Sequence, residues 1–220
     1  MHYGEGSIEV TPPTSATAGP IGRCTLSTDG LITQPFAGTD TVDDIIAHAA
    51  RTTVRALPWD GVISSRRTRR RRSWRKEVVE KKKWKYFELS AYKYLSFVEM
   101  KAAVEEIARA LVDLGVGKGG VFNVYARTSP NWQFMAYACS SISTTIATAY
   151  DTLGKSGLTH SLHEPSCVGL FTNAELFPTL LNVLPHAPSV KYIVFDGAPS
   201  QKILDSLHAV WEDIKVFSID

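Results

Sequence analysis

Short apolar runs alternate with segments of helical spacing through the second half of the chain. The apolar runs predict strands at residues 121–126, 145–149, 167–171, 191–195 and 215–219. The segments between them predict helices that begin at Ser129 and Pro130 or cover residues 154–163, 175–184 and 200–211. This alternation predicts an α/β fold, a parallel sheet with flanking helices and right-handed crossovers. Such sheets bind ligands at the carboxyl ends of their strands, which selects the loops at 127–129, 150–153, 172–174 and 196–199.

Two further helices are predicted before this region. Residues 41–53 combine a capping threonine, two acidic residues in the first turn and an apolar stripe. Residues 96–114 carry the clearer pattern, since Ser96 and Glu99 form a capping box and apolar residues recur at steps of three and four. Gly115 is expected to end this helix in a left-handed conformation.

The same pattern divides the chain into an arm and a domain. Residues 1–38, rich in Pro, Gly, Ser and Thr, predict an extended N-terminal arm that is either partly disordered or packed on the domain. Residues 39–220 predict a partial α/β domain, with an edge hairpin at 59–89 that has a basic tip and the strand–helix repeats at 115–220. No helix follows the strand at 215–219, so its apolar residues are expected at an exposed edge that favours self-association.

Composition narrows the class of protein. The 220 residues are 44% hydrophobic and 21% charged, which is typical of a globular protein. Residues 1–22 have neither the basic nor the apolar stretch of a secretory signal. The three cysteines, Cys24, Cys139 and Cys167, include no close pair, which argues against a disulfide framework and favours a reducing compartment. Cys139 and Cys167 fall in apolar elements and are expected to be inert core thiols.

The net charge of +2 hides one strongly basic segment. Residues 66–85 hold twelve basic and two acidic residues, whereas the rest of the chain holds twelve and twenty. The segment is either a solvated loop between two strands or a binding site for an anionic partner, a membrane surface or, less favoured, a nucleic acid. The second interpretation assigns the contact to Arg66, Arg67, Arg69, Arg70, Arg71, Arg72, Arg75 and Lys76.

Three motifs with apparent chemistry are better explained by local structure. The run G-V-G-K-G-G at 115–120 lacks the Ser or Thr of a phosphate-binding P-loop and lies between a helix and a strand in the wrong order, so it predicts a helix cap and a turn. His160 and His163 do not have zincin spacing and predict a solvated pair rather than a metal site. A G-x-S-x-G nucleophile motif is absent from the sequence, which does not support a serine hydrolase of that type.

Several blocks of sequence are distinctive as wholes. They are W-K-Y-F-E-L-S at 84–90, Y-K-Y at 92–94, T-S at 128–129, N-W at 131–132, T-A-Y-D-T-L-G at 148–154, G-L-T-H-S-L at 157–162, F-T-N-A-E-L at 171–176 and P-S-V-K-Y-I at 188–193. These blocks resemble eukaryotic, especially fungal, long-chain fatty acyl-CoA synthetases, which belong to the adenylate-forming, AMP-binding superfamily. The run D-G-L-I-T at 29–33 also resembles the N-terminal arm of that family.

The resemblance implies a two-step ligase reaction. ATP and a long-chain fatty acid form an acyl-adenylate and pyrophosphate, and the CoA thiol then gives acyl-CoA and AMP, with Mg²⁺ accompanying ATP. It also implies the N-terminal subdomain of the adenylate-forming ligase fold, so that residues 39–220 form a partial AMP-binding domain. The chain corresponds to roughly the first third of such a ligase. The family's phosphate loop ending in P-K-G, its Y-G-L-T-E type motif and its lid with the catalytic lysine have no match in the sequence, so no catalytic residue and no cofactor is assigned to this chain alone.

The resemblance does suggest binding residues for the CoA nucleotide. In the wider superfamily the loops after the second and third strands line the CoA channel, and these loops map to Tyr150, Asp151, Thr152, Thr172 and Asn173. The same residue types serve well in turns and helix caps, so a purely local role is the alternative.

Together these observations predict the N-terminal part of a long-chain fatty acid–CoA ligase, inactive by itself. In the complete enzyme its partners are the fatty acid, ATP and CoA. The expected location is the cytoplasm, at the periphery of endoplasmic reticulum or lipid-droplet membranes. The alternative is a non-catalytic α/β module, which the basic segment at 66–85 attaches to an anionic membrane or nucleic acid.

Overall fold

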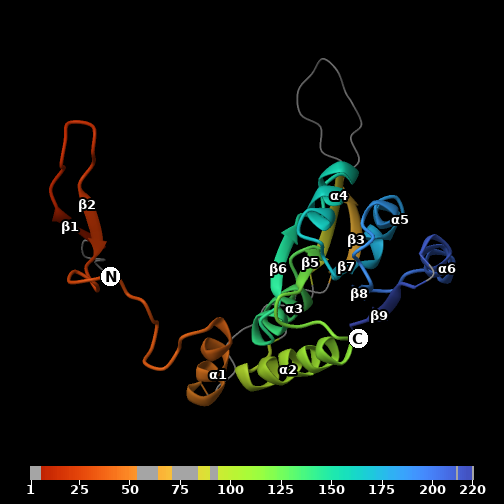
Figure 1. Cartoon of the computed structure of the whole chain (residues 1–220), viewed down its shortest axis with the longest axis horizontal. Helices are drawn as coiled ribbons and strands as arrows, with labels where there is room; N and C mark the ends of the chain where they lie inside the picture. The colour runs from red at the N-terminus through yellow and green to blue at the C-terminus, as the bar shows by residue number, and fades with distance from the viewer. Residues whose placement is uncertain (1–5, 54–63, 71–83, 90–93, 212, 220) are drawn as a thin grey trace. The chain divides into compact units, whose positions relative to one another are not determined.

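The computed structural model describes residues 6–53, 64–70, 84–89, 94–211 and 213–219. The chain divides into two compact units, Met1–Ile45 and Ile46–Asp220. In the colours of Figure 1, the first unit runs from red to orange and the second ends in blue.

The first unit contains a hairpin that the sequence pattern does not predict. Strand β1 (Ser7–Thr11) pairs antiparallel with β2 (Ile21–Cys24), where an extended arm without strands is expected. Most residues of both strands are exposed, so the apolar alternation that marks a half-buried strand is missing. Helix α1 (Val42–Thr52) starts at the end of this unit, as predicted, and Thr41 and Asp44 cap it reciprocally through backbone N–H groups.

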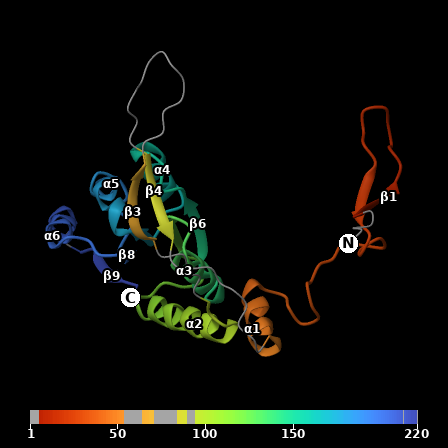
Figure 2. The ribbon, with the colours of Figure 1, turned by 180° about the vertical axis from the view of Figure 1, so that it is seen from behind.

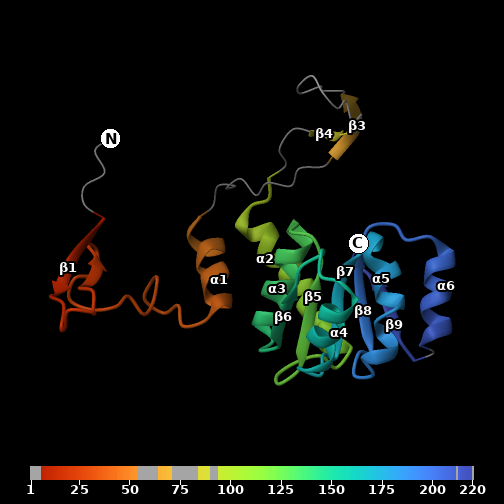
Figure 3. The same ribbon diagram turned by 90° about the horizontal axis from the view of Figure 1, so that it is seen from above.

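The second unit is built on a five-stranded parallel sheet with the strand order β6-β5-β7-β8-β9. Figure 3 shows the strands side by side in this order. The strands are β5 (Val121–Tyr125), β6 (Thr145–Ala149), β7 (Gly169–Asn173), β8 (Tyr192–Asp196) and β9 (Lys215–Ser218). The predicted parallel α/β fold is therefore confirmed.

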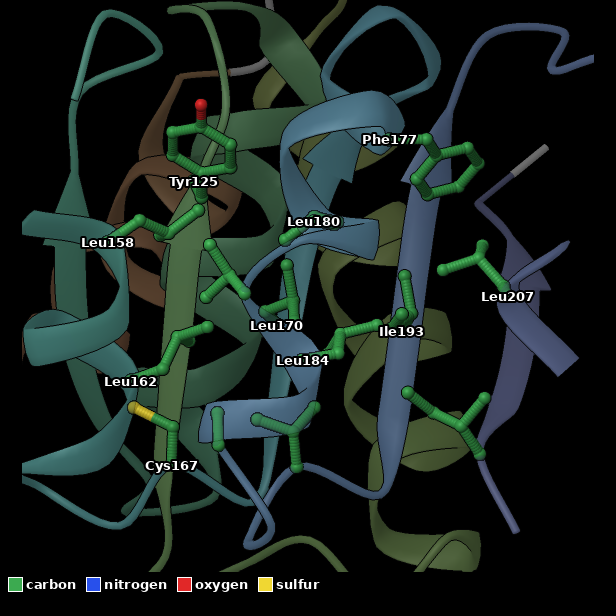
Figure 4. Packing of buried hydrophobic residues seen from close by; sticks show 14 of the residues in the cluster. Tyr125, Leu158, Leu162, Cys167, Leu170, Phe177, Leu180, Leu184, Ile193 and Leu207 are labelled. Atoms are coloured by element: carbon green, nitrogen blue, oxygen red, sulfur yellow. The ribbon is translucent and has the colours of Figure 1, made fainter. Parts of the chain in front are cut away.

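Helices cover both faces of the sheet. One face packs against α2 (Phe97–Asp113) and α3 (Pro130–Ser141), and its core includes Phe122, Val124 and Phe171. The other face packs against α4 (Lys155–His163), α5 (Phe177–Leu181) and α6 (Gln201–Val210). Figure 4 shows the core of this second face, where Leu170 and Ile193 of the sheet meet Leu158, Leu180 and Leu207 of the helices.

Two predicted boundaries are wrong. The third strand is predicted at 167–171 but spans Gly169–Asn173, because residues 166–168 still form the connection from α4. The helix predicted at 175–184 is divided into the 3₁₀ turn Ala174–Leu176, helix α5 and the 3₁₀ turn Leu184–His186. Pro178 lies at the start of α5, and Pro185 lies at the start of the 3₁₀ turn Leu184–His186. Proline has no backbone N–H, so neither residue can donate a hydrogen bond to a carbonyl of the turn before it. A continuous helix is therefore interrupted at these points, whereas proline is well tolerated at the start of a new helix.

Helix α2 has the predicted caps. The Ser96 backbone N–H donates to Glu99 Oε2 at 2.7 Å, and the Glu99 N–H donates to Ser96 Oγ at 3.2 Å. These bonds to the carboxylate hold the pKa of Glu99 below its ordinary value. Gly115 follows the helix with φ +83°, which an L side chain rarely adopts, and Gly119 repeats this value in the turn before β5. The glycine run is thus a helix end and a turn, as predicted.

A second antiparallel pair falls in the region of the predicted basic hairpin. Strand β3 (Ser64–Arg70) pairs with β4 (Trp84–Leu89), and Figure 2 shows the two strands side by side. The register places Arg66 opposite Glu88 and Arg70 opposite Trp84. The predicted charged tip, including Arg71, Arg72, Arg75 and Lys76, lies outside the described residues. The proposed anionic contact of this segment stays a prediction.

The three cysteines differ in exposure as expected. Cys24 is exposed, whereas Cys139 and Cys167 are buried. Burial raises the pKa of Cys139 to about 12 and that of Cys167 to about 11. Both buried thiols are therefore protonated at neutral pH, and a protonated thiol is a poor nucleophile.

Replacement of Gly169 by Ala is expected to destabilise the sheet by about 1–3 kcal/mol. A Cβ at this position meets Phe122 Cε2 at 2.7 Å and the Tyr192 backbone oxygen at 3.0 Å. Urea denaturation followed by circular dichroism measures the loss. The control is Gly117→Ala, where a Cβ has no neighbour within 4 Å. Equal midpoints for the two variants would contradict the close packing of β5, β7 and β8.

A thiol reagent is expected to label one cysteine rapidly in the native protein at pH 8 and three in denaturant. The rapid site is Cys24, because it is exposed while the pKa values of Cys139 and Cys167 are raised to about 12 and about 11. Ellman's reagent measures both the rate and the number of thiols. The rapid phase should vanish in Cys24→Ser, and its persistence would show that a core thiol is accessible.

Candidate functional site

The ends of β5, β6 and β7 are tied together by side chains. The Tyr125 hydroxyl donates to the Asp151 backbone oxygen at 3.2 Å. Arg127 Nε donates to Asp151 Oδ2 at 3.3 Å, and the Arg127 backbone N–H donates to Asn173 Oδ1 at 2.8 Å. Three carboxyl ends, far apart in sequence, thus meet in one polar cluster, which we call the strand-end cluster: Tyr125, Arg127, Asp151 and Asn173.

The strand pattern explains this meeting. Parallel pairing places Tyr125 beside Ala149 on one side and beside Thr172 on the other, so the residues that follow each strand emerge at the same edge. The Arg127 side chain bonds to the same residue, Asp151, as the Tyr125 hydroxyl, so both side chains extend toward the loop between β6 and α4. Tyr125 is 1% exposed, which makes its hydroxyl a fixed donor beneath the loop.

A cavity of about 440 Å³ adjoins the cluster. The β6–α4 loop, α5 and the residue after it form its walls, with Tyr125, Asp151, Thr152, Leu153, Gly154, Lys155, Pro178, Thr179 and Asn182 as the lining residues. Gly154 is the N-cap of α4 and supplies no side chain to the first turn of that helix. The cavity therefore combines hydroxyl, amide and ammonium groups and the positive end of a helix dipole with a single carboxylate, that of Asp151, which is paired with Arg127. This set of groups suits a polar, anionic ligand.

The five predicted CoA-binding residues lie in different environments. Tyr150 is 82% exposed, and Asp151 and Thr152 line the cavity. Asn173 is buried, and its oxygen holds the Arg127 backbone. Thr172 is fully buried, and its hydroxyl has no hydrogen-bond partner among the described atoms, so a ligand has no path to it in this conformation.

Sequence reasoning did not single out three residues that the structure places here. The sequence pattern predicts Tyr125 as part of the strand at 121–126 and Arg127 as part of the loop at 127–129 that follows it. It predicts Lys155 as part of the helix at 154–163. The available signal for Arg127 and Lys155 was their position, since each is a basic residue just after a strand end or at a helix start.

A second, larger groove of about 620 Å³ lies on the other face of the sheet, between α2, α3 and the strands β8 and β9. Its lining is mainly apolar and includes Ile107, Phe134 and Phe217, with Glu106 and Asp113 as its charged groups. Two carboxylates repel an anionic ligand, so the strand-end cluster is the better candidate for one.

Two other sequence features take no part in this site. His160 and Glu164 form an exposed pair on α4, with 2.6 Å between Nε2 and Oε2, in keeping with a solvated histidine. Among the described residues, no group of three or more His, Cys, Asp or Glu side chains has the arrangement of a metal site. Among the same residues, no helix has both the length and the apolar character to cross a bilayer.

Comparison with known proteins gives the family. The model of the family described as "AMP-binding enzyme" matches residues 70–215. Long-chain-fatty-acid–CoA ligase 1 of Schizosaccharomyces pombe is 41% identical over 64% of this chain and 21% of its own length. Long-chain-fatty-acid–CoA ligase 2 of the same organism is 32% identical over 86% of this chain and 28% of its own length. The chain thus spans less than a third of either relative.

Solved structures share the fold. A long-chain-fatty-acid–CoA ligase from Archaeoglobus fulgidus aligns over 83% of this chain and 32% of its own, with a TM-score of 0.55 and 17% identity. The adenylation domain of a carboxylate reductase from Mycobacterium chelonae aligns over 81% of this chain and 28% of its own, with a TM-score of 0.58 and 15% identity. At such identities the likeness concerns architecture alone. Since the family model covers residues 70–215 of the 220, the chain belongs to the AMP-binding enzyme family.

Proposed function

We propose that this chain forms the N-terminal part of a long-chain fatty acid–CoA ligase, which joins a fatty acid to CoA at the expense of ATP. The observation that carries the proposal is the match of several fungal ligases of that activity across this chain. The family match also includes all of β5–β8, so the sheet that positions the strand-end cluster is the part shared with the family.

The contribution of this chain, in the proposal, is a binding surface for the nucleotide end of CoA. Tyr150 offers an exposed ring that can stack on a base, and Asp151 and Thr152 form the adjacent cavity wall. Asn173 acts indirectly by fixing the end of β5. Thr172 can contact CoA only if the loop after β7 opens, because its side chain is fully buried.

Catalysis is assigned to none of the 220 residues. In the described part of the chain, no group of three or more His, Cys, Asp or Glu side chains could hold Mg²⁺. ATP and the acyl group are handled, in this proposal, by parts of the ligase fold that these residues do not supply. The chain alone is therefore a binding part rather than an active enzyme.

We also propose a cellular location for the complete enzyme and a mode of self-association for the isolated chain. A long acyl chain partitions into membranes, which favours a peripheral position on the endoplasmic reticulum or lipid droplets for the complete enzyme.

Strand β9 is at the edge of the sheet, with Phe217 38% exposed, and we propose that this edge promotes self-association of the isolated chain.

A chimeric enzyme tests the function. When these residues replace the matching part of the relative that is 41% identical, the chimera should form palmitoyl-CoA from palmitate, ATP and CoA. The 220-residue chain alone should show no ATP–pyrophosphate exchange above a heat-inactivated control. A folded chimera that cannot form acyl-CoA, or exchange by the isolated chain, would overturn the corresponding part of the proposal.

Replacement of Tyr150 by Ala should weaken CoA binding by about 5- to 150-fold, the range for loss of one base–aromatic stack. The ring is 82% exposed, so folding stability should not change. Isothermal titration calorimetry with CoA measures the effect. Tyr94→Ala is the matched control, because this tyrosine is also exposed but lies before α2. If both variants bind CoA like the wild type, Tyr150 is only a loop residue.

A further inference from the structure

We propose that the Arg127 guanidinium is the phosphate-binding group of the strand-end cluster, and that Asp151 occupies it when no ligand is bound. This inference rests on the proposed function, because it takes the ligand to be the phosphate-bearing nucleotide of CoA. It adds a residue that the resemblance does not supply.

The first support is that the base of the Arg127 side chain is fixed. Its backbone N–H donates to Asn173 Oδ1 at 2.8 Å, and Asn173 is only 8% exposed. Two residues earlier, Tyr125 is buried in the core and bonded to the β6–α4 loop. Arg127 therefore leaves the sheet from a position fixed by Asn173 of the neighbouring strand β7 and by Tyr125 at the end of its own strand β5.

The second support is that the guanidinium itself is accessible. The Arg127 side chain is 61% exposed, and the carboxylate of Asp151 is met through Nε alone at 3.3 Å. An exposed ion pair of this kind contributes little to folding stability, so stability does not account for the pairing of Arg127 with Asp151. A planar guanidinium can bind a phosphate through two parallel N–H donors, which is stronger than one bond to a carboxylate.

The third support is position. Asp151 both bonds Arg127 and lines the cavity, so a phosphate that displaces the carboxylate from Arg127 lies next to a residue of the cavity wall. Lys155, from the first turn of α4, lies on the same cavity wall and adds a second positive charge. A nucleotide with its phosphate on Arg127 thus has the cavity and the exposed Tyr150 ring within the same loop region.

The role of Asp151 follows from charge. Its carboxylate cannot attract a phosphate, but it holds Arg127 in place and competes with the ligand for the guanidinium. Removal of the positive partner and removal of the negative partner should therefore have opposite effects on binding. A purely structural ion pair gives the same effect for both changes, since either one breaks it.

Calorimetric titration of the 220-residue chain tests the inference. We expect Arg127→Ala to weaken CoA binding by about 10- to 100-fold, Arg127→Lys to recover part of the loss, and Asp151→Asn to bind CoA as well as or more tightly than the wild type. The control is Arg109→Ala, an exposed arginine on α2. Urea midpoints should be the same for all four variants, which excludes a folding defect.

The ligands distinguish which phosphate is bound. Dephospho-CoA lacks the ribose phosphate, so its affinity should be insensitive to Arg127→Ala if that phosphate is the partner, and sensitive if the diphosphate bridge is. Inorganic phosphate, as the minimal probe, should bind more weakly and follow the same order of variants.

The results separate the two proposals. If the wild type binds CoA and Arg127→Ala binds it equally well, the role of Arg127 is overturned while the proposed function stands. Equal weakening by Arg127→Ala and Asp151→Asn also overturns it, in favour of a structural pair. If the wild type binds neither CoA nor inorganic phosphate, both this inference and the proposed CoA surface fail, whereas acyl-CoA formation by the chimera still decides the family reaction.

Discussion

The central strand β5 is the constraint on which the second unit depends. It pairs with β6 on one side and with β7 on the other, so its own register fixes both neighbours. Phe122 and Val124 point into one core and Tyr125 into the other, and all three are at most 1% exposed. A strand buried on both faces cannot shift by one residue without exchanging the two cores, and this makes the position of its carboxyl end reliable.

The strand-end cluster depends on this fixed position of the carboxyl end of β5. Tyr125 is the last residue of β5 and Arg127 follows two residues later. The side chains of both donate to Asp151 in the loop after β6, while Asn173 at the end of β7 accepts from the Arg127 backbone N–H. The buried members, Tyr125 and Asn173, supply rigidity, whereas Arg127 and the neighbouring Tyr150, which is not part of the cluster, are exposed to solvent. A rigid floor with adaptable groups above it is how loops on a parallel sheet typically bind ligands.

The polar groups buried inside the sheet region differ from those of the cluster. Asn123 is fully buried on β5 and donates to Ser161 Oγ at 2.9 Å, while its oxygen has no hydrogen-bond partner among the described atoms. The Thr172 hydroxyl has none either. Both side chains are enclosed by the core around α4 and α5, whereas the cluster opens to solvent. The difference separates polar residues that specify packing from those that can meet a ligand.

The sequence by itself determined the order of elements, because each of the five strands is a short apolar run and α2 carries its own start and stop signals in Ser96, Glu99 and Gly115. It also determined the family, through blocks such as T-A-Y-D-T-L-G. It did not determine the exposed β1–β2 hairpin, whose pairing leaves no apolar pattern, or the division of the predicted helix at 175–184 into α5 and two 3₁₀ turns. Only the tertiary structure decided that Arg127, Asp151 and Asn173 meet and that Thr172 is enclosed. The physical reason is that the order of strands in a sheet, not their spacing along the chain, decides which loop ends lie side by side.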